Sequence, residues 1–77
     1  MMIKIRYFGR FAIEIGKFSE ELEVPENTTV REFLEILREK YLKLKDETIE
    51  VSIGGKYARE EDKIGDEISI YPPISGG

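Results

Sequence analysis

The last seven residues of the chain are the ones whose types and spacing could do chemistry. They read Tyr71-Pro72-Pro73-Ile74-Ser75-Gly76-Gly77. Two prolines favour an extended backbone and exclude a helix, while two glycines leave no side chain beside the terminus. Six extended residues from Pro72 onward span at most about 20 Å. We therefore expect the segment to reach into a narrow channel of a partner protein.

Gly77 is the residue at which we expect the chemistry to occur, because we expect it to carry the free α-carboxylate. A carboxylate with a pKa of about 3.5 is ionised at neutral pH. It is then a poor electrophile and must be activated before it reacts. Gly76 gives clearance where a Cβ would collide. The alternative is a frayed terminus without function, but a Gly-Gly that follows a strand and two prolines favours a functional tail.

Composition excludes several classes of function. At 77 residues the chain is one domain near the small end of what folds alone. It contains no cysteine and no histidine, which removes disulfides, thiolate metal sites and the commonest general base. A net charge of −4 argues against nucleic acid as a partner. No apolar run reaches membrane-spanning length and no signal peptide opens the chain, so we expect no membrane partner and a cytoplasmic location.

Alternating apolar residues predict strands over 2–8, 20–24, 48–53, 56–58 and 67–71. The side chains expected to face the core are Ile3, Ile5, Tyr7, Leu22, Val24, Ile49, Val51, Ile53, Ile68 and Ile70. Phe8 and Tyr71 then stand on the opposite, polar face. We interpret residues 10–19 as a long, partly ordered connection, in which Phe11, Ile13 and Ile15 alternate as in a strand and Gly16 could close a short helical turn.

One helix is predicted to begin at Thr29, where Thr29 and Glu32 fit a capping box. An apolar stripe follows at helical spacing and comprises Val30, Phe33, Leu34, Leu37 and Tyr41. Gly54-Gly55 is interpreted as a hairpin turn and not as a phosphate loop. The acidic run 60–62 is interpreted as a solvated turn rather than a cation site, so no metal is expected.

This pattern resembles a ubiquitin-like β-grasp domain and, more narrowly, the small subunit of molybdopterin synthase (the MoaD type of sulfur carrier). The segments that carry the resemblance are 3–8, the helix start 29–32, the turn 65–67 and the ending 71–77. The resemblance implies an α+β fold with a mixed sheet of four to five strands packed on one main helix. The β-grasp domain would cover residues 1–71, and residues 72–77 would form a flexible, extended Gly-Gly tail.

The family's first and last strands lie parallel and adjacent, which implies that Phe8 and Tyr71 meet at one edge of the outer face. Tyr57 matches a third apolar position of the family's partner surface. The resemblance thus implies an exposed aromatic patch of Phe8, Tyr57 and Tyr71 beside the tail. The residues expected to contact partners are Phe8, Tyr57, Tyr71, Pro72, Pro73, Ile74 and Ser75.

By the same resemblance the chain is a sulfur carrier that is not catalytic alone and binds no cofactor. An E1-like adenylating enzyme (MoeB type) would spend ATP on Gly77, and a sulfur donor would then leave a C-terminal thiocarboxylate. The large subunit of molybdopterin synthase (MoaE type), in a heterotetramer, would pass the sulfur to a pterin precursor for the molybdenum or tungsten cofactor. The alternatives are a protein modifier that forms isopeptide bonds through Gly77, a thiamin-pathway sulfur carrier and a plain interaction domain.

Overall fold

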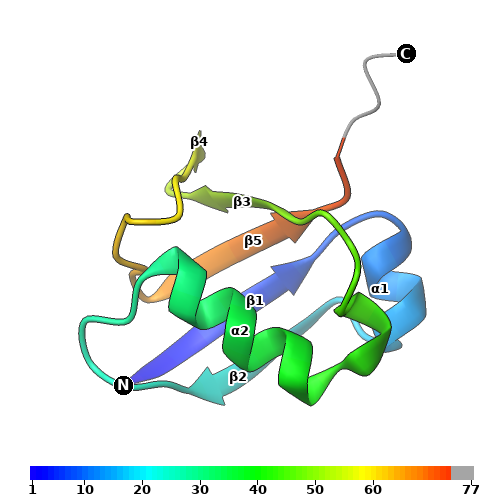
Figure 1. Cartoon of the computed structure of the whole chain (residues 1–77), viewed down its shortest axis with the longest axis horizontal. Coiled ribbons are helices and arrows are strands. Elements are labelled where there is room, and N and C mark those ends of the chain that lie inside the picture. Colours follow the sequence, from blue (N-terminus) through cyan, green and yellow to red (C-terminus); the bar gives the residue numbers. More distant parts are fainter. Residues whose placement is uncertain (74–77) are drawn as a thin grey trace.

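A computed structural model describes residues 1–73 and shows a mixed sheet of five strands with α2 lying across one face (Figure 1). In chain order the elements are β1 (Met2–Tyr7), α1 (Arg10–Ile15), β2 (Ser19–Glu23), α2 (Val30–Lys40), the short 3₁₀ helix η1 (Leu42–Leu44), β3 (Glu50–Ile53), β4 (Lys56–Tyr57) and β5 (Glu67–Tyr71). The strand order is β2-β1-β5-β3-β4. This is the α+β, β-grasp arrangement that the sequence predicted.

The two chain ends of the domain run side by side in the sheet. β1 and β5 pair in parallel, with Ile5 opposite Ile68 and Tyr7 opposite Ile70. The remaining pairs, β1–β2, β3–β4 and β3–β5, are antiparallel. Parallel pairing places the carboxyl ends of β1 and β5 at the same edge of the sheet. The polypeptide that leaves β5 toward the C-terminus therefore starts beside the end of β1.

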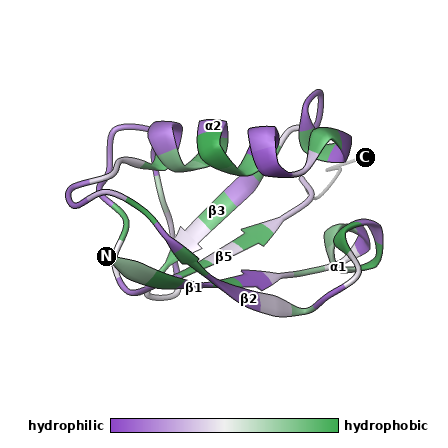
Figure 2. Ribbon diagram, turned by 90° about the horizontal axis from the view of Figure 1, so that it is seen from below, coloured by the Kyte–Doolittle hydropathy of each residue, from purple (hydrophilic) through white to green (hydrophobic). Residues whose placement is uncertain are grey.

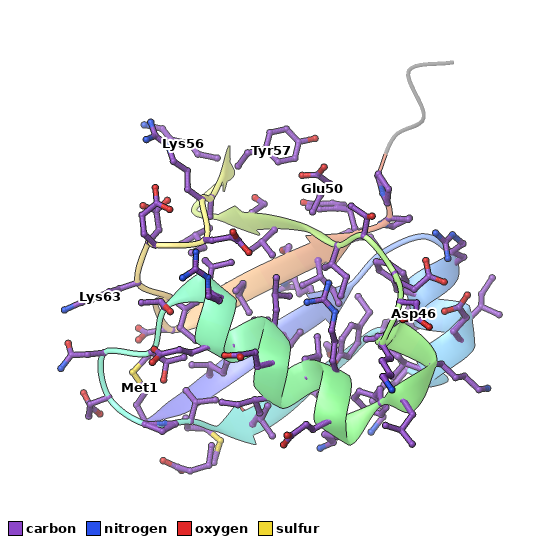
Figure 3. All side chains as sticks on the ribbon, in the orientation of Figure 1. Met1, Asp46, Glu50, Lys56, Tyr57 and Lys63 are labelled. Atoms are coloured by element: carbon purple, nitrogen blue, oxygen red, sulfur yellow. The ribbon has the colours of Figure 1, made fainter. Side chains whose placement is uncertain are left out.

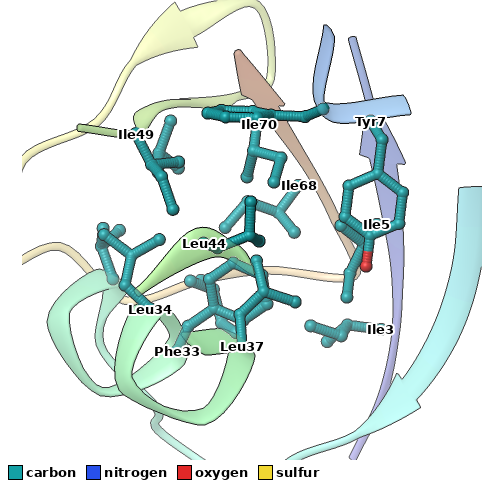
Figure 4. Close-up of a cluster of buried hydrophobic side chains, with 14 of the residues drawn as sticks. Ile3, Ile5, Tyr7, Phe33, Leu34, Leu37, Leu44, Ile49, Ile68 and Ile70 are labelled. Carbon is teal, nitrogen blue, oxygen red and sulfur yellow. The ribbon is translucent and has the colours of Figure 1, made fainter. Parts of the chain in front are cut away.

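The core lies between the sheet and α2 (Figure 4). Strand alternation sends one side chain in two inward, so Ile3, Ile5 and Tyr7 of β1 are buried while their neighbours are exposed. From α2 the buried side chains are Val30, Phe33, Leu34 and Leu37. The hydrophobic side of α2 faces the sheet and the hydrophilic side faces away (Figure 2). The inward residues predicted for β1, β5 and α2 are thus confirmed except for Tyr41, which follows the end of α2 and is half-buried.

The start of α2 is the predicted capping box. The Thr29 hydroxyl accepts a hydrogen bond from the Glu32 backbone N–H at 3.2 Å, and the Glu32 carboxylate accepts one from the Thr29 N–H at 2.9 Å. These bonds satisfy two backbone donors that helix geometry leaves without partners. The backbone N–H and the hydroxyl of Thr29 both donate to the Glu32 carboxylate, which stabilises its charged form and lowers its pKa.

The interpretation of residues 10–19 as a partly ordered connection was wrong, because Arg10–Ile15 forms the helix α1. Phe11 and Ala12 are buried, whereas Ile13 is 82% exposed. Adjacent buried residues followed by an exposed one fit a turn of about 100° per residue and not the period of a strand. Gly16 does close the helix, with φ of 87° and its N–H donating to the Ala12 carbonyl at 2.9 Å.

Strand ends also differ slightly from the prediction. β1 ends at Tyr7, so Phe8 lies one residue beyond the strand, and β3 begins at Glu50 rather than at residue 48. β4 ends at Tyr57 rather than at Ala58. The Gly54-Gly55 turn has the positive φ values of 60° and 81° that a tight hairpin uses.

A polar cluster centred on Glu20 joins β2 to α2. Both Tyr7 and Tyr41 donate their hydroxyl hydrogen bonds to its carboxylate, and Lys40 Nζ lies 3.2 Å from it. Burial alone would raise the pKa of Glu20, but the bonds from Tyr41, Tyr7 and Lys40 outweigh it and lower the pKa. Burial and this carboxylate raise the pKa of Tyr41 to about 12 and that of Tyr7 further. The cluster is structural: a charge is paired where β2 meets the core.

Two further observations apply to the part of the chain that the structure describes. Residues 1–73 hold no group of three acidic, histidine or cysteine side chains able to bind a metal ion. The Asp62 carboxylate instead accepts the Arg59 backbone N–H at 2.8 Å, as expected of a turn. Within the same residues, neither α1 nor α2 has the length and apolar character needed to cross a bilayer.

Candidate functional site

The parallel pairing of β1 and β5 brings two aromatic rings together where the tail begins. The Phe8 N–H donates to the Ile70 carbonyl at 3.1 Å, which extends the register one residue past β1 and sets Phe8 beside Tyr71. The two rings stack with centroids 4.8 Å apart and planes 19° from parallel. Phe8 stays 41% exposed and Tyr71 is half-buried. The predicted meeting of Phe8 and Tyr71 at one sheet edge is what the structure shows.

Tyr57 stands across an open hollow from Tyr71. On β3, Glu50 pairs with Tyr71 and Ser52 pairs with Tyr57, so these side chains share the outer face of the sheet. The hollow has a volume of about 260 Å³ and is lined by Glu50, Ser52, Gly55, Tyr57, Tyr71 and Pro72. In Figure 3, Glu50 and Tyr57 lie at the same edge of the domain as the end of β5, where the tail begins. Tyr57 is 69% exposed, so its ring is free for a contact.

The three aromatic residues therefore make a series along the sheet edge rather than a single cluster. Phe8 touches Tyr71, Tyr71 forms one wall of the hollow, and Tyr57 forms another. Exposed aromatic side chains grouped in this way are typical of protein-binding surfaces. Their role in binding stays a prediction.

Gly9 is a site residue that the sequence analysis missed. Its φ of 60° with ψ of −142° is a conformation that residues with a Cβ rarely adopt. A Cβ at this position would also lie 3.1 Å from Pro72 Cγ and 3.3 Å from Pro72 Cδ. The first residue of the tail thus packs against bare backbone at the end of β1. A glycine directly after the aromatic residue that closes the predicted strand 2–8 was the available signal.

Pro72 is half-buried and Pro73 is exposed, so the described part of the tail moves from the domain surface into solvent. Ile74, Ser75, Gly76 and Gly77, which were predicted to contact partners or carry the chemistry, lie outside the described residues. The described part of the site fixes where the tail starts, through the contact of Pro72 with Gly9. The chain has neither histidine nor cysteine, so a partner must supply imidazole or thiolate chemistry.

Charge on the outer face is balanced near this site. Arg6 and Glu67 form an ion pair between β1 and β5, and both side chains are about half exposed. At the start of α1, Arg10 pairs with Glu47 at 2.8 Å. The Arg10 hydrogen bond lowers the pKa of the Glu47 carboxyl. Exposed pairs of this kind contribute little to stability.

Comparison with known proteins agrees with this picture. The molybdopterin synthase sulfur carrier subunit of Caenorhabditis briggsae is 31% identical over 81 residues, which cover 97% of this chain and 96% of that protein. A solved structure from Pyrococcus furiosus, assigned as molybdopterin converting factor subunit 1, has a TM-score of 0.86 at 26% identity. It covers 96% of this chain and 99% of its own.

Two further solved structures bear on partners. The complex of subunits 1 and 2 of molybdopterin-converting factor from Helicobacter pylori contains a chain with a TM-score of 0.66 at 25% identity, aligned over 100% of both chains. Small archaeal modifier protein 1 from Methanosarcina acetivorans has a TM-score of 0.76 at 28% identity, with 99% of this chain and 96% of that one covered. Residues 5–77 match the ThiS family, and the chain belongs to that family.

Proposed function

We propose that this chain is the sulfur carrier subunit of a molybdopterin synthase. The observation that carries the proposal is the full-length similarity to curated sulfur carrier subunits, at 31% identity over 97% of the chain. The stacked pair of Phe8 and Tyr71 and the seat of Pro72 on Gly9 support it. These contacts start the tail at a surface suited to docking a second protein.

The proposed chemistry begins at the Gly77 carboxylate. One of its oxygens attacks the α-phosphorus of ATP in the active site of an adenylating enzyme, and pyrophosphate leaves. The product is an acyl-adenylate, whose carbonyl carbon is an electrophile with AMP as the leaving group. Sulfide attacks that carbon, and AMP departs with the electron pair of the C–O bond that breaks, so that a C-terminal thiocarboxylate remains. ATP is bound by the partner and not by this chain.

The loaded tail then enters the large subunit of the synthase. There the thiocarboxylate sulfur is transferred to a pterin precursor and water restores the Gly77 carboxylate. One of the similar solved structures is a complex of subunits 1 and 2 of molybdopterin-converting factor. We infer that this chain binds the same type of large subunit, in a heterotetramer. Phe8, Tyr57 and Tyr71 dock the partners, Pro72 and Pro73 direct the tail, and Ile74, Ser75 and Gly76 thread the channel.

Two tail variants test the proposal. Replacing Gly76 with Leu adds a side chain beside the terminus, and appending one alanine after Gly77 moves the carboxylate by one residue. We expect both variants to lose ATP-dependent sulfur acquisition, measured as intact mass after incubation with the adenylating enzyme, ATP and sulfide. Thermal unfolding should match the wild type, because neither change touches the core. An extended protein that still acquires sulfur would contradict the proposal.

A protein-modifier role is the second candidate, and the similarity to small archaeal modifier protein 1 favours keeping it. The same acyl-adenylate attacked by a lysine amine would give an isopeptide bond at Gly77. Immunoblots of cell extract would then show conjugates of higher mass that disappear when Gly76 and Gly77 are deleted. Their absence in cells that make the pterin cofactor would leave the carrier role alone.

A further inference from the structure

α1 and the loop after it carry the two most exposed large hydrophobic side chains among the described residues. Ile13 and Phe18 are each 82% exposed, compared with 41% for Phe8 at the stacked pair. The fold does not need an apolar residue at either position, since α1 is anchored by the buried Phe11 and Ala12. Single exposed hydrophobic residues are common, so what matters is whether these two act together.

Ile13 and Phe18 do lie around one hollow. Its volume is about 460 Å³, and its walls also include Phe8, Gly9 and Ala12. We call the set Phe8, Ala12, Ile13 and Phe18 the α1 face. A hollow lined by several apolar side chains is a surface that water wets poorly and that a partner can cover. The grouping is created by the helix, which brings residues 12, 13 and 18 next to the end of β1.

The α1 face is continuous with the root of the tail. Phe8 belongs to both surfaces, because its ring lines the hollow and also stacks on Tyr71 at 4.8 Å. Gly9 likewise lines the hollow and seats Pro72. A protein that holds the tail from Pro72 onward therefore passes over the edge of the α1 face. The face adds contact area to the same encounter.

The charge of the α1 face and the lifetime of the complex that would cover it indicate which partner binds there. The chain has a net charge of −4, yet the one charged residue lining this hollow is Arg6. Arg6 is already paired with Glu67, so a matching surface is apolar. Subunits that stay together bury more apolar interfaces than proteins that meet transiently. Two side chains that are 82% exposed suit a lasting subunit better than an enzyme that visits only to adenylate Gly77.

We propose that the α1 face docks the large subunit that receives the tail, as a second contact beside the stacked pair of Phe8 and Tyr71. The inference rests on the proposed function, because it names a surface for that subunit. It adds to that function a binding role for Ile13 and Phe18. Neither residue was among the predicted partner contacts.

Titration calorimetry with the purified large subunit from the same organism tests the proposal. Ile13→Ser and Phe18→Ser should each raise the Kd about tenfold, which is typical of truncating a buried interface anchor. Leu42→Ser is the matched control, since Leu42 is 74% exposed but does not line this hollow. It should leave the Kd unchanged. All three variants should unfold at the wild-type temperature, because none removes core contacts.

Two outcomes would overturn the proposal. One is a Kd that is equal for the wild type and both α1-face variants. The other is sedimentation showing that the wild-type chain forms a dimer which Ile13→Ser and Phe18→Ser dissociate, since the face would then join copies of this chain. The proposed function is tested separately, by measuring whether the wild-type chain acquires sulfur at Gly77. A wild-type chain that acquires none would contradict the proposed function. That measurement involves no α1-face variant.

Discussion

Gly9→Ala probes the contact that sets where the tail starts. The new Cβ meets two obstacles: a backbone at φ 60° and ψ −142°, and Pro72 Cγ at 3.1 Å. Holding a residue other than glycine in such a conformation costs about 1–3 kcal/mol. Crowding Pro72 adds to this, because the ring must move by a few tenths of an ångström and small overpacking costs about 1 kcal/mol. The two terms together give a loss of about 2–4 kcal/mol, and each kcal/mol lowers Tm by about 4–8 °C in a domain of this size.

The two terms can be separated by a double-mutant cycle. Pro72→Ala removes the ring but leaves the backbone of Gly9 unchanged. Gly9→Ala made in the Pro72→Ala background then meets only the backbone cost, so we expect it to destabilise by about 1 kcal/mol less than in the wild type. The assay is urea unfolding of the four proteins, followed by circular dichroism. Effects that add to within about 0.3 kcal/mol would refute the Gly9–Pro72 contact as a source of order at the tail root.

The remaining predictions concern the Glu20 cluster and the stacked pair. Because folding lowers the pKa of Glu20 from its ordinary 4.5, its contribution is complete above that value and is lost as the pH falls through the folded-state pKa. Glu20→Gln should therefore destabilise the protein by about 1–3 kcal/mol at neutral pH. The free energy of unfolding of the variant should also fall less steeply than that of the wild type below about pH 4.5. Urea unfolding over a pH series measures this, and an equally steep fall in both proteins would contradict it. Tyr71→Ala removes the ring that stacks on Phe8 and one wall of the 260 Å³ hollow, so its Kd for the large subunit should rise at least tenfold, while Tyr57→Phe, which keeps its ring, should bind as the wild type does.

Much of the fold was readable from sequence because its signals are local. The capping box at Thr29 and Glu32 marks the start of α2 to the residue. β5 was predicted with its bounds because Gly65-Asp66 precedes it and Pro72 follows it. The position of Phe8 beside Tyr71 is different in kind. It depends on the parallel register of two strands some 60 residues apart, and only the resemblance to β-grasp proteins supplied that pairing.

The features that the sequence analysis predicted wrongly or missed also have physical explanations. α1 is six residues long, too short for helical periodicity to outweigh an alternation of Phe11, Ile13 and Ile15 that suits a strand equally. The role of Gly9 depends on Pro72, which is distant in sequence, so no local pattern could reveal it. Exposure of Ile13 follows from the helical turn of α1, and Phe18 lies in the loop after that helix, so the prediction of a loose connection concealed both. The expected roles of Gly76 and Gly77 stay predictions.

The central claim is that Gly77 carries sulfur, and one measurement tests it most directly. The purified chain is incubated with ATP, the adenylating enzyme and a sulfide source, and its intact mass is recorded with and without an alkylating reagent. The account predicts a gain equal to the replacement of one oxygen by sulfur, located at Gly77 by fragmentation and shifted by alkylation. An unchanged mass, with an adenylating enzyme shown to be active on another carrier, would contradict the account and favour a plain interaction domain.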